Sequence, residues 1–193
     1  SEHIDDFIWL YERLCDYRSK KTLYSILNNW YRYDFTTTTQ SREYMFDDYF
    51  DLDIVKCGEN EVIADLGAFI GDTVLSYINN YGDSYKKIYC YEITPDVFVM
   101  LKENLSGLRD IHFRMKGVSD KAGKMSVSSN EASSSANRLS SSEGPDGSDI
   151  IVTTLDEDID EPLTLIKADI EGFEQKALLG ARRHIAEDHP KLL

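Results

Sequence analysis

Short apolar runs alternate with amphipathic stretches from residue 61 onwards, and this alternation limits the possible folds more than any other feature of the chain. The apolar runs predict strands over 61–66, 87–92, 111–118 and 163–168, and the amphipathic stretches predict helices over 71–80, 95–105 and 172–185. Repeated strand–helix–strand units build a mostly parallel sheet with helices on both faces. The sequence therefore predicts an α/β fold of the Rossmann-like type.

The first part of the chain has a different pattern. Apolar side chains recur every three or four residues over 4–18, and a second helical pattern runs from Leu23 to Trp30. A length of 193 residues suits one domain with an appendage better than two full domains. We therefore predict a helical hairpin within an N-terminal appendage of residues 1–53, followed by the main domain over 54–193.

Aromatic residues lie close together shortly before the first predicted strand: Tyr44, Phe46, Tyr49 and Phe50. Such a group more often attaches an appendage to the core through its large apolar surface. It could also line a substrate pocket, and the sequence leaves both roles open.

An irregular stretch separates the third and fourth predicted strands. Residues 125–128 and 150–155 predict the strands of a side hairpin. Residues 128–148 are dominated by serine, with asparagine, glycine and proline, and this composition cannot support a core. The segment therefore predicts a surface loop, with a lid over the site as the alternative.

The charge of the chain excludes some partners. Acidic residues outnumber basic residues by 35 to 21, which gives a formal net charge of -14. A surface this negative repels the phosphate backbone of nucleic acids and anionic lipid headgroups. No apolar run approaches the ~20 residues that a membrane helix needs. We therefore expect neither a nucleic-acid partner nor a membrane partner.

Cysteine and histidine residues are sparse and scattered. The cysteines are Cys15, Cys57 and Cys90. Their odd number and wide spacing argue against a disulfide framework and against a structural zinc site, and they suit a reducing cytoplasm. The histidines do not cluster either, and no acidic metal box is visible, so we predict no metal site.

The most informative segment is the turn after the first predicted strand. The strand ends in Asp65, and the chain passes through Gly67 and Gly71 into a helix. Ligands of open α/β sheets bind beyond the carboxyl ends of the strands, and glycine lets the backbone come close to a ligand. We therefore expect the turn to hold a cofactor, with these candidate residues: Asp65, Gly67, Ala68, Phe69, Gly71, Asp72 and Thr73.

The second predicted strand ends in Glu92, 25 residues after Gly67. A carboxylate at this position can accept hydrogen bonds from both hydroxyl groups of a ribose, which indicates a nucleoside-containing cofactor. A dinucleotide site expects GxGxxG, whereas this turn has only GxxxG. Asp65 and Asp72 would repel a pyrophosphate and would suit the ammonium and sulfonium groups of S-adenosylmethionine. The charges therefore favour this methyl donor over NAD.

A second group of polar residues follows the fourth predicted strand. Lys167, Asp169 and Glu171 are our candidates for catalysis. Both acids can accept a proton or a hydrogen bond from a substrate hydroxyl, and Lys167 could pair with either acid and tune it. Acids that complement a helix dipole explain Glu171 adequately. They explain Asp169 less well, because that residue precedes the helix.

In this order, the segments resemble the FkbM family of methyltransferases over roughly residues 44–193. The resemblance rests on Asp65–Asp72, Tyr91–Glu92 with Pro95, Gly117–Asp120 with Gly123, Thr154–Asp156, Ile166–Gly172 and Ala177–Ala181. It implies a class I methyltransferase fold, S-adenosylmethionine as donor and usually transfer to oxygen. The family's Glu-Pro is Glu92-Ile93-Thr94-Pro95 here, which changes the turn beside the ribose, and Ile93 is a further candidate cofactor residue. The resemblance also implies that four residues lie beside the adenine: Gly117, Val118, Ser119 and Asp120.

The resemblance also sets an expectation for the end of the chain. Pro190–Leu193 correspond to the start of the family's fifth strand, which implies a C-terminally truncated domain without its closing strands. An unpaired sheet edge favours pairing with another chain, so we expect a homo-oligomer.

These observations predict an S-adenosylmethionine-dependent methyltransferase. It would transfer a methyl group by in-line displacement to a hydroxyl of a small-molecule or glycan acceptor, with Asp169 orienting or deprotonating that hydroxyl. Two alternatives remain from the sequence. One is a non-catalytic cofactor-binding or interaction domain of the same fold, and the weaker one is an NAD-dependent oxidoreductase.

Overall fold

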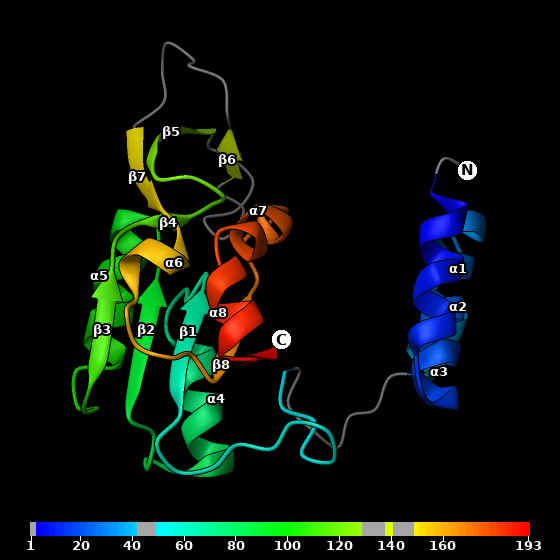
Figure 1. The fold of residues 1–193 in the computed structure, drawn as a ribbon, viewed down its shortest axis with the longest axis horizontal. Coiled ribbons are helices and arrows are strands. Elements are labelled where there is room, and N and C mark those ends of the chain that lie inside the picture. Colours follow the sequence, from blue (N-terminus) through cyan, green and yellow to red (C-terminus); the bar gives the residue numbers. More distant parts are fainter. Residues whose placement is uncertain (1–2, 42–48, 129–137, 141–148) are drawn as a thin grey trace. The chain divides into compact units, whose positions relative to one another are not determined.

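A computed structural model describes residues 3–41, 49–128, 138–140 and 149–193 (Figure 1). The chain forms two compact units, Ser1–Phe46 and Asp47–Leu193. The boundary that we predicted after residue 53 falls later than this division. The reason is Phe50, which is 1% exposed and packs in the core of the second unit.

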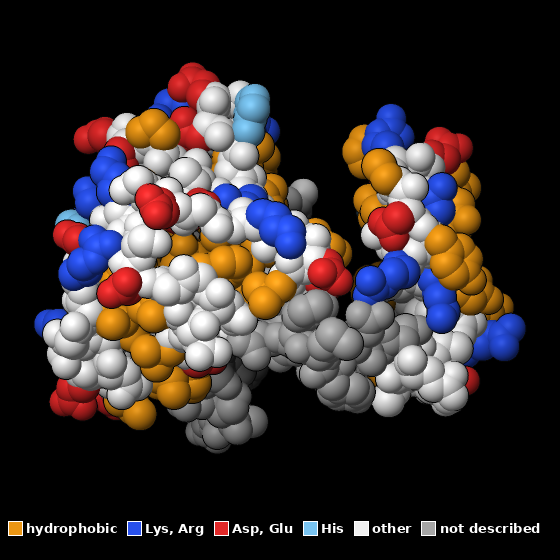
Figure 2. All heavy atoms as spheres, turned by 90° about the horizontal axis from the view of Figure 1, so that it is seen from below, with side chains coloured by type: hydrophobic (Ala, Val, Ile, Leu, Met, Phe, Trp, Pro, Cys, Tyr) orange, Lys and Arg blue, Asp and Glu red, His pale blue; other side chains and the backbone are white. Residues whose placement is uncertain are grey.

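The first unit is helical. It consists of α1 (Ile4–Arg13), α2 (Tyr17–Arg32) and α3 (Thr36–Ser41). The helix that we predicted over 4–18 ends earlier, because Asp16 accepts a hydrogen bond from the Ser19 backbone N–H at 2.8 Å and caps the start of α2. Many large apolar side chains of this unit are exposed, and Figure 2 shows apolar side chains on its surface.

The second unit is built on a parallel sheet. Its strands are β1 (Val62–Leu66), β2 (Lys87–Tyr91), β3 (Ile111–Arg114), β8 (Leu165–Ala168) and β9 (Lys191–Leu192). They are arranged in the order β3-β2-β1-β8-β9, and every neighbouring pair is parallel. This confirms the predicted Rossmann-like sheet, and β9 supplies the fifth strand that we expected at the end of the chain.

Helices cover both faces of this sheet (Figure 1). One face packs against α4 (Asp72–Tyr81) and α5 (Pro95–Asn104), and its core includes Ile63, Ile88 and Leu165. The other face packs against α6 (Leu155–Asp158), α7 (Glu174–Leu179) and α8 (Arg182–Glu187), and its core includes Val62, Leu66 and Ile166. Alternate residues of β1 therefore belong to opposite cores.

The helix that we predicted over 172–185 is wrong as a single element. It divides into α7 and α8 at Gly180, whose carbonyl accepts a hydrogen bond from the Asp156 backbone N–H at 3.0 Å. A Cβ atom at Gly180 would lie 2.0 Å from the Ser119 carbonyl oxygen. Glycine therefore allows the backbone at Ser119, directly after β4, to approach the break between the two helices.

A second, smaller sheet contains β4 (Gly117–Val118), β5 (Gly123–Ser128), β6 (Arg138–Ser140) and β7 (Asp149–Thr153), in the order β4-β7-β5-β6. The antiparallel pair β5–β7 confirms the predicted side hairpin. The strand predicted over 111–118 is wrong, because its two ends pair with different partners in different sheets: β3 with β2, and β4 with β7. Most of the serine-rich segment 128–148, with its proposed lid, lies outside the described residues.

The strand predicted over 150–155 also ends early. Thr154 accepts a hydrogen bond from the Glu157 backbone N–H at 3.1 Å, so it caps α6, which begins at Leu155. The predicted aromatic cluster is only partly described. Tyr44 and Phe46 lie outside the described residues. Phe50 packs in the core, as expected of a residue that anchors the preceding segment to the domain.

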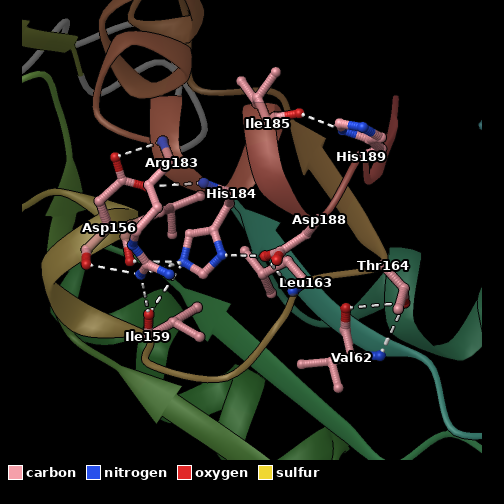
Figure 3. A network of polar contacts seen from close by, with 11 residues as sticks. Val62, Asp156, Ile159, Leu163, Thr164, Arg183, His184, Ile185, Asp188 and His189 are labelled. Atoms are coloured by element: carbon pink, nitrogen blue, oxygen red, sulfur yellow. Dashed lines mark hydrogen bonds and ion pairs between the residues drawn. The ribbon is translucent and has the colours of Figure 1, made fainter.

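A polar network fixes α8 against α6 and the start of β8 (Figure 3). His184 is fully buried, and its Nδ1 lies 2.6 Å from Asp188 Oδ2, which also accepts from the Leu163 backbone N–H at 2.9 Å. Arg183 donates to the carbonyl oxygens of Asp156 and Ile159 at 2.9 and 2.8 Å. These bonds hold the strand whose far end carries Lys167 and Asp169.

We expect Glu161 to make the stability of the fold acid-sensitive. Burial alone would raise the pKa of Glu161, but hydrogen bonds from Lys86, Lys87 and Tyr89 outweigh it and lower that pKa from 4.5 to about 2. The resulting stabilisation, on the order of 2 kcal/mol, is present above the unfolded pKa and is lost as the pH falls from 4.5 towards 2.

Thermal unfolding between pH 6 and pH 3 measures this effect. The Glu161→Gln variant should unfold at a temperature several degrees lower than the wild type at pH 6, and the difference should shrink towards pH 3. Glu103→Gln, which changes an exposed glutamate of α5, is the matched control. A difference that stays constant across this pH range would contradict the assignment.

Candidate functional site

A cavity of about 210 Å³ lies where the carboxyl ends of β1, β2 and β8 meet the start of β4. It is lined by Tyr49, Leu66, Gly67, Phe69, Asp72, Thr73, Tyr91, Glu92, Ile93, Thr94, Lys116, Gly117, Val118, Lys167, Asp169, Ile170 and Glu171. The two groups of residues that the sequence singled out, after β1 and after β8, therefore face one space.

The turn after β1 is held between its two neighbouring strands. The backbone N–H groups of Gly67 and Ala68 donate to the Tyr91 carbonyl at 3.0 and 2.9 Å. Gly67 has a φ of +76°, and a Cβ atom there would lie 2.1 Å from the Asp169 carbonyl oxygen. Only glycine satisfies both the backbone conformation and the close approach of β8.

Glu92 binds the backbone around the cavity. Its Oε1 accepts from the N–H groups of Ile93 and Thr94 at 2.8 and 2.7 Å, and its Oε2 accepts from the Phe69 N–H at 3.2 Å. A carboxylate offers about four lone-pair positions, and three are used here. Glu92 therefore has room for one ribose hydroxyl, and a second would have to displace one of these backbone bonds.

Lys167 takes a different partner from those we predicted. Its side chain is buried, and Nζ donates to the Gly67 carbonyl at 2.8 Å and lies 3.2 Å from Asp65 Oδ1. The prediction that Lys167 pairs with Asp169 or Glu171 is therefore wrong in this structure. The parallel register of β1 and β8 sets Asp65 directly beside Lys167, and this explains the pairing.

Asp65 does not reach the cavity. It is fully buried and points to the α4 face of the sheet, because side chains alternate along β1 and Asp65 shares its face with Ile63. Burial raises the pKa of Asp65, and the Lys167 ammonium opposes that rise. The pair links the ends of β1 and β8, and the Asp65 carboxylate does not line the cavity.

Asp169 and Glu171 are exposed at the cavity. Asp169 Oδ2 accepts a hydrogen bond from the Tyr49 hydroxyl at 2.6 Å. Glu171 has a φ of +55°. The loop between them is held by Glu174, whose Oε1 accepts from the N–H groups of Ile170 and Gly172 at 3.0 and 3.1 Å. Glu174 therefore fixes the backbone of this loop, and the carboxylates of Asp169 and Glu171 lie at the cavity.

Most of the predicted cofactor residues line the cavity: Gly67, Phe69, Asp72, Thr73, Glu92, Ile93, Gly117 and Val118. Others do not: Asp65, Ala68, Gly71, Ser119 and Asp120. Ala68 and Ser119 are buried, and their N–H groups bind the carbonyls of Tyr91 and Thr153. Asp120 is exposed and accepts a hydrogen bond from the Ser119 hydroxyl at 3.0 Å.

Sequence reasoning missed several lining residues: Leu66, Tyr91, Thr94, Lys116 and Ile170. Leu66 and Tyr91 end β1 and β2, so the rule that these strand ends share an edge could have found them. Lys116 fell inside a strand that we predicted to be continuous. Tyr49 was proposed only within a group that could line a pocket, and no local signal connected it with Asp169.

Among the described residues, no cluster of three or more potential ligands could hold a metal ion, and no helix is long and apolar enough to span a bilayer. The sheet order, the glycine turn after β1 and the acids after β2 and β8 define a Rossmann-like methyltransferase fold. The family model for the methyltransferase FkbM domain matches residues 65–193. The chain belongs to this family.

One solved structure supports the same fold. A crystal structure of methyltransferase FkbM from Methylobacillus flagellatus KT superposes with a TM-score of 0.80 at 26% identity, covering 99% of this chain and 47% of that chain. An rRNA methylase from Streptococcus thermophilus gives a TM-score of 0.40 at 12% identity, over 66% of this chain and 55% of that one. No curated protein matches. The chain thus spans about half the length of the FkbM structure.

Proposed function

We propose that this chain binds S-adenosylmethionine in the cavity and transfers its methyl group to a hydroxyl of a small-molecule or sugar acceptor. One observation carries the proposal. A single cavity joins the glycine turn and Glu92, which suit a nucleoside cofactor, to the exposed carboxylate of Asp169, which suits an acceptor hydroxyl. Family membership supports the same class of reaction.

The charge around the turn supports the choice of cofactor. Asp72 is exposed at the start of α4, where a dinucleotide site would hold its pyrophosphate. Its carboxylate opposes a pyrophosphate and attracts the ammonium or sulfonium of S-adenosylmethionine. Asp65 adds nothing to this argument, because it is buried beside Lys167. The charge argument therefore rests on Asp72.

Different residues of the cavity have different roles in the proposed reaction. When bound, S-adenosylmethionine supplies a methyl group already activated by its sulfonium. Glu92 and the backbone of the Gly67 turn hold the nucleoside, and Lys167 keeps that turn against β8 through the Gly67 carbonyl. Asp169 accepts a hydrogen bond from the acceptor hydroxyl and orients its oxygen in line with the methyl group, and it can take up the released proton.

Calorimetric titration of S-adenosylhomocysteine and of NAD into the same sample tests the proposal. We expect the homocysteine compound to bind and NAD not to bind. Binding of NAD alone would contradict the proposal and would indicate an NAD-dependent oxidoreductase. Binding of neither compound would contradict a cofactor site and would favour an interaction domain. The absence of nucleic-acid and membrane partners, the cytoplasmic location and the homo-oligomer stay predictions.

A further inference from the structure

Tyr49 belongs to the short segment that precedes β1, yet its hydroxyl lies at the cavity. It donates to Asp169 Oδ2 at 2.6 Å, across 120 positions of sequence. Lys167 Nζ lies 5.4 Å from the centroid of the Tyr49 ring. Tyr49 therefore contacts two of the three residues that we selected as candidates for catalysis.

Attachment of this segment to the core does not explain the hydroxyl of Tyr49. The neighbouring Phe50 already provides an anchor, because it is 1% exposed and its ring centroid lies 6.0 and 5.7 Å from those of Tyr77 and Tyr81. The Tyr49 ring packs at the edge of the same core and is half-buried beside the cavity. A phenylalanine would pack equally well there, so the hydroxyl serves Asp169.

The direction of this hydrogen bond is fixed by the phenol. Burial, followed by the contact with Asp169, raises the pKa of Tyr49. The phenol therefore stays protonated and donates the hydrogen bond to Asp169. A carboxylate has about four lone-pair positions. Asp169 can therefore accept from Tyr49 and from a second hydroxyl at the same time, with Tyr49 holding the carboxylate in place.

The charges around Tyr49 disfavour an anionic ligand. Asp72, Asp169 and Glu171 are exposed carboxylates at the cavity and disfavour an anionic acceptor. The two lysines there are occupied: Lys167 by the Gly67 carbonyl and Asp65, and Lys116 by Asp158 at 2.6 Å. An uncharged ring with hydroxyl groups could pack against the aromatic ring of Tyr49 and donate hydrogen bonds to the carboxylates.

We propose that Tyr49 and Asp169 form the acceptor subsite, with Tyr49 as a positioning residue and an uncharged hydroxylated ring, such as a sugar, as the ligand. This inference rests on the methyl-transfer function proposed above. The Tyr49 ring packs against the acceptor, and the Tyr49 hydroxyl holds Asp169 so that its carboxylate faces the reacting hydroxyl.

NMR of the chain labelled with ¹³C at tyrosine Cζ tests the subsite. The resonance that is missing from the Tyr49→Phe spectrum belongs to Tyr49. With S-adenosylhomocysteine bound, methyl α-D-glucopyranoside should shift this resonance, whereas the anionic D-glucuronate at equal concentration should leave it unchanged. Tyr81→Phe is the matched control, because the Tyr81 hydroxyl donates to the Val55 carbonyl at 2.8 Å instead of to Asp169.

The affinities of the two variants complete the test. Tyr49→Phe should weaken glucoside binding by about 10-fold or more, because Asp169 would lose the charge-assisted hydrogen bond that holds its carboxylate in place for the ligand, with S-adenosylhomocysteine affinity changed less than about twofold. Tyr81→Phe should change neither. Cofactor binding without a glucoside-specific shift of Tyr49 would overturn the subsite and leave the proposed function standing. If the wild type does not bind S-adenosylhomocysteine, both the acceptor subsite and the proposed function are overturned.

Discussion

Replacing Gly67 with alanine should abolish measurable binding of S-adenosylhomocysteine and destabilise the fold. The new methyl group would lie 2.1 Å from the Asp169 carbonyl oxygen, in a backbone conformation with a φ of +76°. The left-handed conformation alone costs roughly 1–2 kcal/mol in alanine. Relief of the clash would also move the end of β1 away from β8, and that movement would separate the two halves of the cavity. We expect an affinity loss of at least about 100-fold, or about 2.7 kcal/mol.

Gly82 offers a matched control for this change. It has a φ of +82° at the end of α4, and a Cβ atom there would meet no atom within 4 Å. Gly82→Ala therefore carries the backbone strain without the clash. Urea unfolding should show a larger loss of stability for Gly67→Ala than for Gly82→Ala, and calorimetry should show a binding defect only for the former. Equal behaviour of the two variants would mean that the contact with Asp169 does not matter.

The second large effect is expected at Asp169. The Asp169→Asn variant keeps the size of the side chain but removes the charge that accepts the hydrogen bond or proton of the acceptor. Turnover should fall by about 10²- to 10⁴-fold, the usual contribution of a positioned acid or base. Affinity for S-adenosylhomocysteine should stay within a few-fold, because Glu92 and the Gly67 turn, which we propose as the nucleoside contacts, are unchanged.

Formation of S-adenosylhomocysteine from S-adenosylmethionine, with methyl α-D-glucopyranoside as the acceptor, measures this turnover. Asp83→Asn is the control, because Asp83 is exposed before β2, away from the cavity residues. An Asp169→Asn variant with wild-type turnover would remove Asp169 from the reaction. A parallel collapse of cofactor affinity would assign Asp169 to the cofactor instead of to the acceptor.

Local patterns were sufficient to predict the sheet and much of the site. Each strand of the main sheet is a short apolar run followed by an amphipathic helix or a turn, and the carboxyl ends of parallel strands necessarily meet at one edge. The meeting of Gly67, Glu92 and Asp169 at one cavity follows from that rule. The glycine turn and its place at the cavity were therefore predictable from residues within each unit of the repeat.

The remaining features depend on contacts between distant residues. A strand that is buried on both faces shows no alternation, so the sequence could not show that Asp65 points towards α4 and not towards the cavity. The break between α7 and α8 depends on the approach of Ser119 to Gly180, and the position of Tyr49 depends on Asp169. No pattern within a short window carries such information.

The contact between Gly67 and Asp169 also restricts how relatives of this chain can diverge. Gly67, in the turn proposed to hold the cofactor, and Asp169, proposed to face the acceptor, approach each other closely through main-chain atoms, and Lys167 links the same two strands. A larger residue at position 67 would require a compensating shift of the backbone at 167–169. Changes of acceptor preference should therefore arise through side chains such as Tyr49 and Glu171, with this backbone junction retained.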